Sequence, residues 1–180
     1  MSDFEGFPKI ARLARECTIT EKIDGTNACI YFPDDGSGVL IGSRTRWITP
    51  ADDNYGFARW VHDHLTELET LGPGRHFGEW WGAGIQRRYG LLEKRFSLFN
   101  TFRWTDPATR PACCDVVPIL YQGVFTTDVV ETQLERLRAF GSVAAPGFLQ
   151  AEGVKVCHHA AKTYFKQTLV KDDEWKGKGE

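Results

Sequence analysis

The sequence lacks the features that mark membrane-spanning and disulfide-rich secreted proteins. No apolar run approaches the roughly 18 residues that a transmembrane helix needs, and the N-terminus has no apolar core of a secretion signal. The five cysteines are odd in number and show no C-x-x-C spacing, which argues against a disulfide framework. We therefore expect a protein without a membrane partner, in a reducing compartment, most simply the cytoplasm.

The sequence also lacks an excess of positive charge. Its 22 Lys and Arg against 24 Asp and Glu give a formal net charge of −2, which excludes a uniformly basic nucleic-acid-binding coat but permits a local basic patch. The 180 residues are 42% hydrophobic and 26% charged, as in ordinary globular proteins. This length predicts one domain, residues 1–180.

Strand patterns dominate the chain. Short apolar or alternating stretches between turn residues predict strands at residues 17–23, 28–33, 39–44, 75–81, 96–102, 116–121, 153–157 and 163–170. Only short turns separate the first three, which we expect to form an antiparallel meander.

Two helices interrupt this pattern. Apolar residues at three- and four-residue spacings predict helices over residues 54–71 and 128–140. Residues 49–52 resemble a capping box for the first helix, whereas Asp128 suits the N-cap of the second and Gly141 its end. Runs of strands with two inserted helices predict an α+β fold with antiparallel sheets.

The most informative segment is residues 21–27, EKIDGTN, at the end of the first predicted strand. Strand alternation places Lys22 on the same face as Thr18 and Thr20. An amine at a strand end beside a glycine turn can face a ligand; a surface lysine before a turn is the alternative. Seven residues do not decide between the two, because short motifs recur by chance.

Six segments together resemble the motifs of the covalent nucleotidyltransferases, which comprise polynucleotide ligases and mRNA capping enzymes. In the order used by that superfamily, they are residues 21–27 (motif I), 43–44 (Ia), 77–82 (III), 96–100 (IIIa), 152–156 (IV) and 164–166 (V). Six matches in order are far more specific than one. DNA ligases and capping enzymes commonly have arginine where this chain has Asn27, and the pattern E-K-x-[DH]-G-[ST]-N resembles the RNA ligase 2-like family.

The resemblance implies an α+β nucleotidyltransferase domain of the ligase and capping type, with antiparallel sheets and flanking helices around an ATP cleft. It implies an ATP-dependent RNA ligase that joins 5′-phosphate and 3′-hydroxyl ends of nicked or end-apposed RNA through a covalent lysyl-AMP intermediate. ATP and Mg²⁺ (or Mn²⁺) are the implied cofactors. We expect no C-terminal OB-fold or other accessory domain, so one further partner to consider is an accessory protein that supplies RNA binding.

The resemblance assigns catalysis to three residues. Lys22 is the expected nucleophile, which attacks the α-phosphorus of ATP. Because an ordinary lysine is protonated at neutral pH, nearby cations such as Arg44, Lys166 and a bound Mg²⁺ are expected to favour its neutral form. Lys166 is also expected to neutralise the α-phosphate, and Asn27 to position the RNA ends around the AMP.

Asp24 lies two residues after Lys22 and would stabilise the protonated amine if the two side chains met. We therefore expect the turn at Gly25 to direct Asp24 elsewhere. The resemblance assigns the divalent metal to Glu152, a hard oxygen ligand of the kind that Mg²⁺ prefers; an exposed charge before a strand is the alternative.

The resemblance assigns nucleotide binding to Glu21, Ile23, Arg44, Glu79, Phe99 and Lys166. Arg44 is expected at a phosphate or the ribose. Glu79 stands in a run of aromatic residues and needs a polar partner, for which the ribose hydroxyls and a salt bridge are the alternatives. Phe99 falls on the more polar face of the predicted strand at 96–102, which suits stacking on adenine, although core packing is the common fate of a phenylalanine.

One departure leaves other functions open. Relatives often carry two lysines spaced K-x-K in motif V, whereas Lys166 is followed by Thr168 at the second place. The alternatives are a GTP-dependent capping-type guanylyltransferase, a DNA ligase, and a degenerate nucleotide- or RNA-binding module without catalysis.

Overall fold

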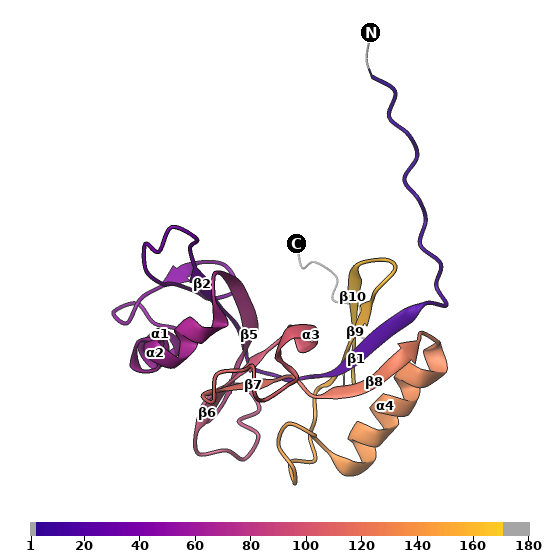
Figure 1. Ribbon diagram of the computed structural model, residues 1–180. Coiled ribbons are helices and arrows are strands. Elements are labelled where there is room, and N and C mark those ends of the chain that lie inside the picture. Colours follow the sequence, from indigo (N-terminus) through magenta and orange to yellow (C-terminus); the bar gives the residue numbers. More distant parts are fainter. Residues whose placement is uncertain (1–2, 171–180) are drawn as a thin grey trace, which may run out of the picture.

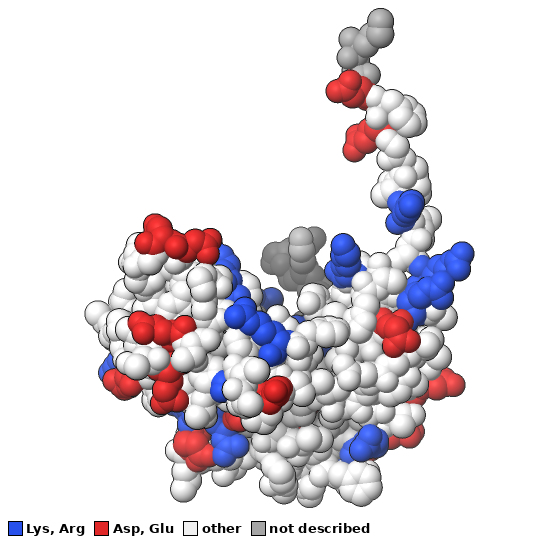
Figure 2. All heavy atoms as spheres, in the orientation of Figure 1, with Lys and Arg blue, Asp and Glu red and all other residues white. Residues whose placement is uncertain are grey.

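Two β-sheets build the described part of the molecule, and the chain passes from one to the other after β1 (Glu16–Lys22) (Figure 1). The computed structural model describes residues 3–170. Each sheet forms the base of one lobe, and Figure 2 shows a hollow between the two lobes. This arrangement confirms the predicted α+β class.

The first sheet has four antiparallel strands in the order β10-β9-β1-β8. They are β1 (Glu16–Lys22), β8 (Ile119–Val124), β9 (Gly153–His158) and β10 (Thr163–Thr168). Helix α4 (Thr127–Phe140) covers one face of this sheet, where Leu134 and Leu137 pack against Ile19 and Val156. The opposite face carries Thr18, Thr20 and Lys22, of which the two threonines are buried and Lys22 is partly exposed.

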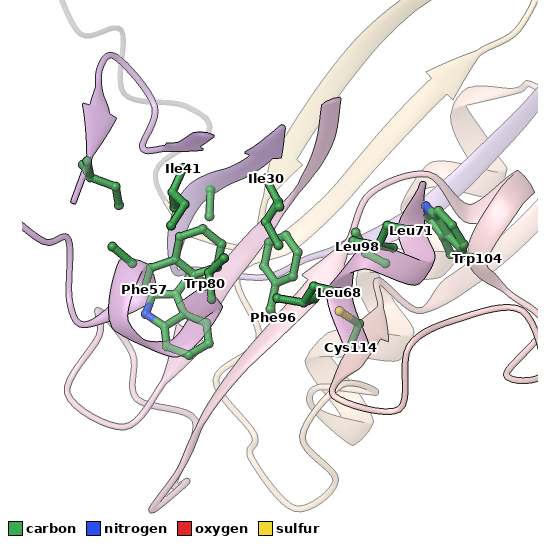
Figure 3. Close-up of a cluster of buried hydrophobic side chains, with 14 of the residues drawn as sticks. Ile30, Ile41, Phe57, Leu68, Leu71, Trp80, Phe96, Leu98, Trp104 and Cys114 are labelled. Atoms are coloured by element: carbon green, nitrogen blue, oxygen red, sulfur yellow. The ribbon is translucent and has the colours of Figure 1, made fainter. Parts of the chain in front are cut away.

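The second sheet has six strands in the order β4-β3-β2-β5-β6-β7. They are β2 (Thr26–Phe32), β3 (Leu40–Gly42), β4 (Trp47–Ile48), β5 (Gly74–Gly82), β6 (Lys94–Leu98) and β7 (Cys114–Val116). One face packs against α1 (Phe57–Asp63), α2 (Leu65–Leu68) and the 3-10 turn η1 (Glu69–Leu71), through the aromatic and aliphatic cluster of Figure 3. The other face carries Asn27 and Glu79, and the Asn27 side chain donates a hydrogen bond to the Glu79 carboxylate.

The predicted meander of the first three strands is wrong. β1 pairs with β8 and β9, whereas β2 pairs with β3 and β5. Gly25 explains the change of sheet, because it packs so closely against β5 that the chain must leave the first sheet there. The sheets are also not wholly antiparallel, since β6 and β7 run parallel.

Local hydrogen bonds correct the predicted boundaries of one helix and one strand. The helix at 54–71 is divided into α1, α2 and η1, and Asp53, not the predicted box at 49–52, accepts hydrogen bonds from the first-turn amides of Ala58 and Arg59. The strand at 96–102 ends at Leu98, because the Asn100 side chain accepts from Arg103 N and begins α3 (Thr101–Trp104).

Helix α4 is capped by Thr126, whose hydroxyl accepts from Val129 N at 3.2 Å, and not by Asp128. Its predicted end at Gly141 is confirmed, with φ of 80°. The predicted strand at 116–121 is divided between β7 and β8. All five cysteines are free, and within residues 3–170 no helix has the length and apolar character needed to cross a membrane.

Candidate active site

The site forms around Lys22, the last residue of β1. Its Nζ lies 2.5 Å from Oε1 of Glu152, which directly precedes β9. The two side chains are 27% and 14% exposed, so this ion pair is shielded but reachable from solvent. Pairing of β1 with β9, which sets Lys22 opposite Gly153, brings these residues together across 130 positions of sequence.

The turn after Lys22 directs Asp24 away from the amine, as predicted. The Asp24 carboxylate accepts from Arg87 Nε at 2.9 Å, and its backbone N–H donates to the Tyr89 hydroxyl at 2.7 Å. This partnership anchors the turn to the loop after β5, and it leaves Glu152 as the carboxylate that pairs with Lys22.

Gly25 is required by close approach to β5. A Cβ atom at this position would lie 2.5 Å from the carbonyl oxygen of Trp80 and 2.7 Å from Cβ of Trp81. Because no side chain fits there, the Gly25 amide can approach Glu79 and donates to its Oε1 at 3.1 Å. The glycine of motif I thus joins the two sheets at the site.

Glu79 is a buried carboxyl group, 8% exposed, between the two sheets. Its Oε2 accepts from Asn27 Nδ2 at 3.0 Å. Burial raises the pKa of Glu79 to about 7, although the hydrogen bonds from Asn27 and Gly25 and the charge of Lys22 act in the opposite direction. The protonated form of Glu79 is therefore retained to a higher pH than in an ordinary glutamate.

Three lysines occupy the face of the first sheet that lies opposite α4. Lys155 of β9 stands directly opposite Thr20 of β1 and Lys166 of β10, so its side chain shares their face. Lys22 follows two residues after Thr20 on that face. A cationic sheet face beside a nucleophile suits a polyphosphate.

Phe99 lies at the edge of this lysine face. It is half-buried, and the Lys155 ammonium lies 4.5 Å from the centre of its ring and 4.5 Å from that of Tyr164. Burial lowers the pKa of Lys155. The predicted ring for base stacking is thus in the cleft, with a lysine over it that the motif comparison left without a role.

Glu21 and Ile23 point away from the lysine face. The Glu21 carboxylate is 1% exposed and accepts from the Ser142 hydroxyl at 2.6 Å and from the amides of Val143 and Ala144 at 2.8 and 2.9 Å. Burial raises the pKa of Glu21, against the effect of these bonds. Its side chain therefore holds the loop after α4, and any contact with a nucleotide would have to come from its backbone.

Ile23 is buried in a small cluster with Trp81 and Tyr89. Arg44 is exposed in the turn between β3 and β4. Among the described residues it forms no ion pair, and the structure does not bring it into contact with Lys22, Glu79 or Glu152. Lys166 is exposed on β10 and likewise has no ion pair within residues 3–170.

One carboxylate oxygen of Glu152 has no partner within the described part of the chain and suits a divalent cation. Its Oε2 is buried and has no hydrogen-bond partner, an arrangement that is costly without a ligand. No group of three or more His, Cys, Asp or Glu gathers within residues 3–170. A cation held here would therefore rely on Glu152 and on substrate phosphates, as Mg²⁺ commonly does.

Lys155 and Tyr164 are the residues of the cleft that sequence reasoning missed. The signal was present in the strand itself, because Lys155 interrupts a run of valines and alternates with them. The position of Lys155 in the cleft follows from the pairing of β9 with β1 and β10, which no local sequence pattern predicts.

Comparison with solved structures shows the same fold in RNA ligases. A Naegleria gruberi RNA ligase variant solved with ATP and Mn matches with a TM-score of 0.64 and 19% identity, over 87% of this chain and 50% of that one. A second variant of that ligase, with AMP and Mn, matches with a TM-score of 0.60 and 20% identity, over 87% and 50%. This chain thus spans about half the length of the structures it matches.

No curated protein sequence gives a significant match. A family profile described as RNA ligase, however, matches residues 15–171. That range includes all six motif segments and every described strand and helix. The chain belongs to the RNA ligase family.

Proposed function

We propose that this chain is the nucleotidyltransferase part of an ATP-dependent RNA ligase and that Lys22 carries the AMP. The observation that supports this most directly is the Lys22 amine, in a cleft beside Glu152 and Glu79 with Phe99 at its edge. The Naegleria gruberi structures solved with ATP and Mn suggest that this chain uses ATP and a divalent metal.

In the first step, the lone pair of Lys22 Nζ attacks the α-phosphorus of ATP. A P–N bond forms, the bond from that phosphorus to the bridging oxygen breaks, and pyrophosphate leaves. Glu152 Oε1 already accepts a hydrogen bond from the amine, so it is the atom placed to receive the proton. Lys155 and Lys166 offset the negative charge that develops on the phosphate oxygens.

Two residues fit the remaining groups of the nucleotide. Glu79 can accept hydrogen bonds from the ribose hydroxyls. The Phe99 ring can stack on the base once the Lys155 ammonium, which lies over that ring, moves aside. A divalent cation held by Glu152 would neutralise phosphate charge when bound.

In the second step, a 5′-phosphate oxygen of the RNA attacks the same phosphorus, the P–N bond breaks, and Lys22 recovers its amine by taking back the proton that Glu152 received in the first step. In the third, a 3′-hydroxyl oxygen attacks the RNA 5′-phosphorus and loses its proton to solvent, while the bond from that phosphorus to the bridging oxygen breaks and AMP leaves. The exposure of Asn27 and its hydrogen bond to Glu79 support the expected role of this residue in contacting the RNA ends.

Intact-mass measurement tests the first step. Purified protein incubated with ATP and Mg²⁺ or Mn²⁺ should gain the mass of one adenylyl group, and Lys22→Ala should gain none. Lys9→Ala, in the exposed N-terminal segment, is the matched control and should behave as the parent. Absence of an adduct with every nucleotide, or an adduct that persists in Lys22→Ala, would overturn the proposal.

The same assay separates the alternatives. An adduct from GTP instead of ATP would indicate a capping-type guanylyltransferase, and nicked duplexes with RNA or DNA at the 3′-hydroxyl side would distinguish RNA from DNA sealing. A binding module without catalysis is the second candidate, favoured by the single motif V lysine, Lys166. It would show a thermal shift with ATP and no adduct. An accessory protein that supplies RNA binding is part of the proposal.

A further inference from the structure

The cleft-facing surface of the second sheet continues well beyond Glu79. Register pairs Asn27 of β2 with Glu79 of β5, and two residues farther along each strand it pairs Cys29 with Phe77. Because side chains alternate in strands, these residues and the next pair, Tyr31 and Arg75, all share the face that carries Glu79. The surface therefore begins at the active site and runs away from it.

Aromatic rings and one guanidinium group dominate this surface. The Arg75 guanidinium carbon lies 4.3 Å from the centre of the Tyr31 ring and 5.2 Å from that of Trp47. The Tyr31 and Trp47 rings are stacked, with centres 6.3 Å apart and planes 22° from parallel. We call Tyr31, Trp47, Arg75 and Phe77 the aromatic strip.

The aromatic strip lies next to Phe99, the residue predicted to stack on the base. The Phe99 amide donates to the Phe77 carbonyl at 2.9 Å, which makes the two phenylalanines neighbours across adjacent backbone segments. Phe77 is 53% exposed and Trp47 is 46% exposed. The strip thus runs along one sheet face from Phe77, whose backbone bonds to Phe99, through Arg75 to the stacked rings of Tyr31 and Trp47.

Stability of the sheet does not account for this row. The buried cluster that fixes the second sheet lies on its opposite face, against α1 and α2 (Figure 3). Large rings grouped on a solvent-facing surface commonly mark an interaction site. The partner should be flat and apolar on its faces, so that it can stack, and anionic, since Arg75 lies on the strip and the lysine face lies across the hollow.

The positive charge beside the hollow agrees with an anionic partner. Figure 2 shows Lys and Arg side chains along the wall that the second lobe presents to the hollow. Of the acidic groups near the strip, Glu79 has hydrogen bonds from Asn27 and Gly25, and Asp52 is paired with Arg46. An RNA strand is the polymer that supplies both flat bases and phosphates.

We propose that the aromatic strip binds unpaired bases of the RNA strand whose end is joined at Lys22. This inference rests on the proposed function. A single strand is favoured over a duplex because its bases are free to stack on rings and guanidinium groups, whereas an A-form duplex presents mainly its backbone and a shallow groove. The strip thereby supplies sequence-tolerant RNA binding next to the site of chemistry.

Fluorescence anisotropy with a labelled single-stranded RNA of mixed sequence tests the proposal. Trp47→Ala and Arg75→Ala should each weaken binding at least fivefold, the lower end of what stacking on a base contributes. Arg75→Lys should also weaken binding, because it keeps the charge but loses the planar group. The double variant Phe140→Ala/Arg138→Ala, which removes an exposed ring and an arginine from α4, is the matched control and should bind as the parent.

Adduct formation with ATP, measured without RNA, keeps the two proposals apart. The strip variants should form the lysyl-AMP adduct as the parent does, which also shows that they are folded. Three results would overturn the proposed RNA binding by the strip. The first is parent-like RNA binding by both Trp47→Ala and Arg75→Ala. The others are tighter binding of the duplex of the same sequence than of the single strand, and no RNA binding by the parent. Loss of the adduct in the parent would instead overturn the proposed function.

Discussion

The buried carboxyl group of Glu79 makes stability depend on pH in an unusual direction. Burial raises its pKa from 4.5 to about 7, so the native state binds this proton more tightly than the unfolded chain does. Between about pH 4.5 and about pH 7 the unfolded chain has lost the proton and the native state keeps it. The contribution of Glu79 to the free energy of unfolding is therefore largest below pH 4.5 and is lost as pH rises through about 7.

The size of this effect follows from the two pKa values. At about 1.4 kcal/mol per pKa unit, the difference between 4.5 and about 7 corresponds to about 3 kcal/mol. The groups that face the carboxyl are the Asn27 amide, the Gly25 N–H, Lys22 and Glu152. Glu79→Gln is uncharged at every pH, and its amide oxygen can still accept from Gly25. We expect this variant to match the parent near pH 4.5 and to be more stable by up to about 3 kcal/mol above pH 7.

Urea denaturation at several pH values from about 4.5 to about 8 measures this difference directly. Glu131→Gln removes an exposed glutamate from α4 and corrects for the general effect of one lost negative charge. Parallel stability curves for the parent and Glu79→Gln would refute the reasoning, because they would show that Glu79 titrates alike in the native and unfolded states. A variant less stable than the parent above pH 7 would refute it equally.

Two further substitutions test the site. Gly25→Ala should abolish adduct formation and lower the melting temperature, because the added Cβ would lie 2.5 Å from the Trp80 carbonyl oxygen; a fully active variant would contradict the required approach. Lys155→Met keeps the length of the side chain over Phe99 but removes its charge. We expect calorimetry to show ATP binding weakened more than tenfold, since a hydrogen bond to a charged group contributes about 1.5–3 kcal/mol, with little change in stability. Unchanged ATP affinity would show that Lys155 does not contact the phosphates.

Sequence predicted the parts of the site that strand alternation controls. Thr18, Thr20 and Lys22 share the face that was expected, and Phe99 and Glu152 lie at its edges. Three of these five residues, Lys22, Phe99 and Glu152, could be assigned to one site only from the order of the motifs, since Glu152 is 130 positions from Lys22. The same alternation puts the Glu21 side chain on the opposite face, so the nucleotide contact expected of Glu21 stays a prediction that its backbone would have to fulfil.

The fold was harder to predict wherever short-range hydrogen bonds compete with strand or helix patterns. Asn100 turns an apolar stretch into the start of α3, and Thr126 begins α4 ahead of Asp128. The pairing of the first strands was also predicted wrongly. A short turn joins β1 to β2, but a short turn does not show whether the two strands pair with each other. Lys155 and the aromatic strip are visible only after pairing is known, since each depends on residues brought together by neighbouring strands.

The positions of the lysines in the first sheet suggest a division of labour. β1 is hydrogen-bonded on both sides, to β8 and β9, so the backbone that carries Lys22 is fixed more firmly than any edge strand. Lys166 lies on β10, an edge strand of that sheet within the described residues. A nucleophile must meet one phosphorus atom along one line, whereas a charge that offsets developing negative charge acts over a wider range of positions. The central strand thus holds the residue whose geometry is strict, and the edge strand holds the residue that acts through its charge.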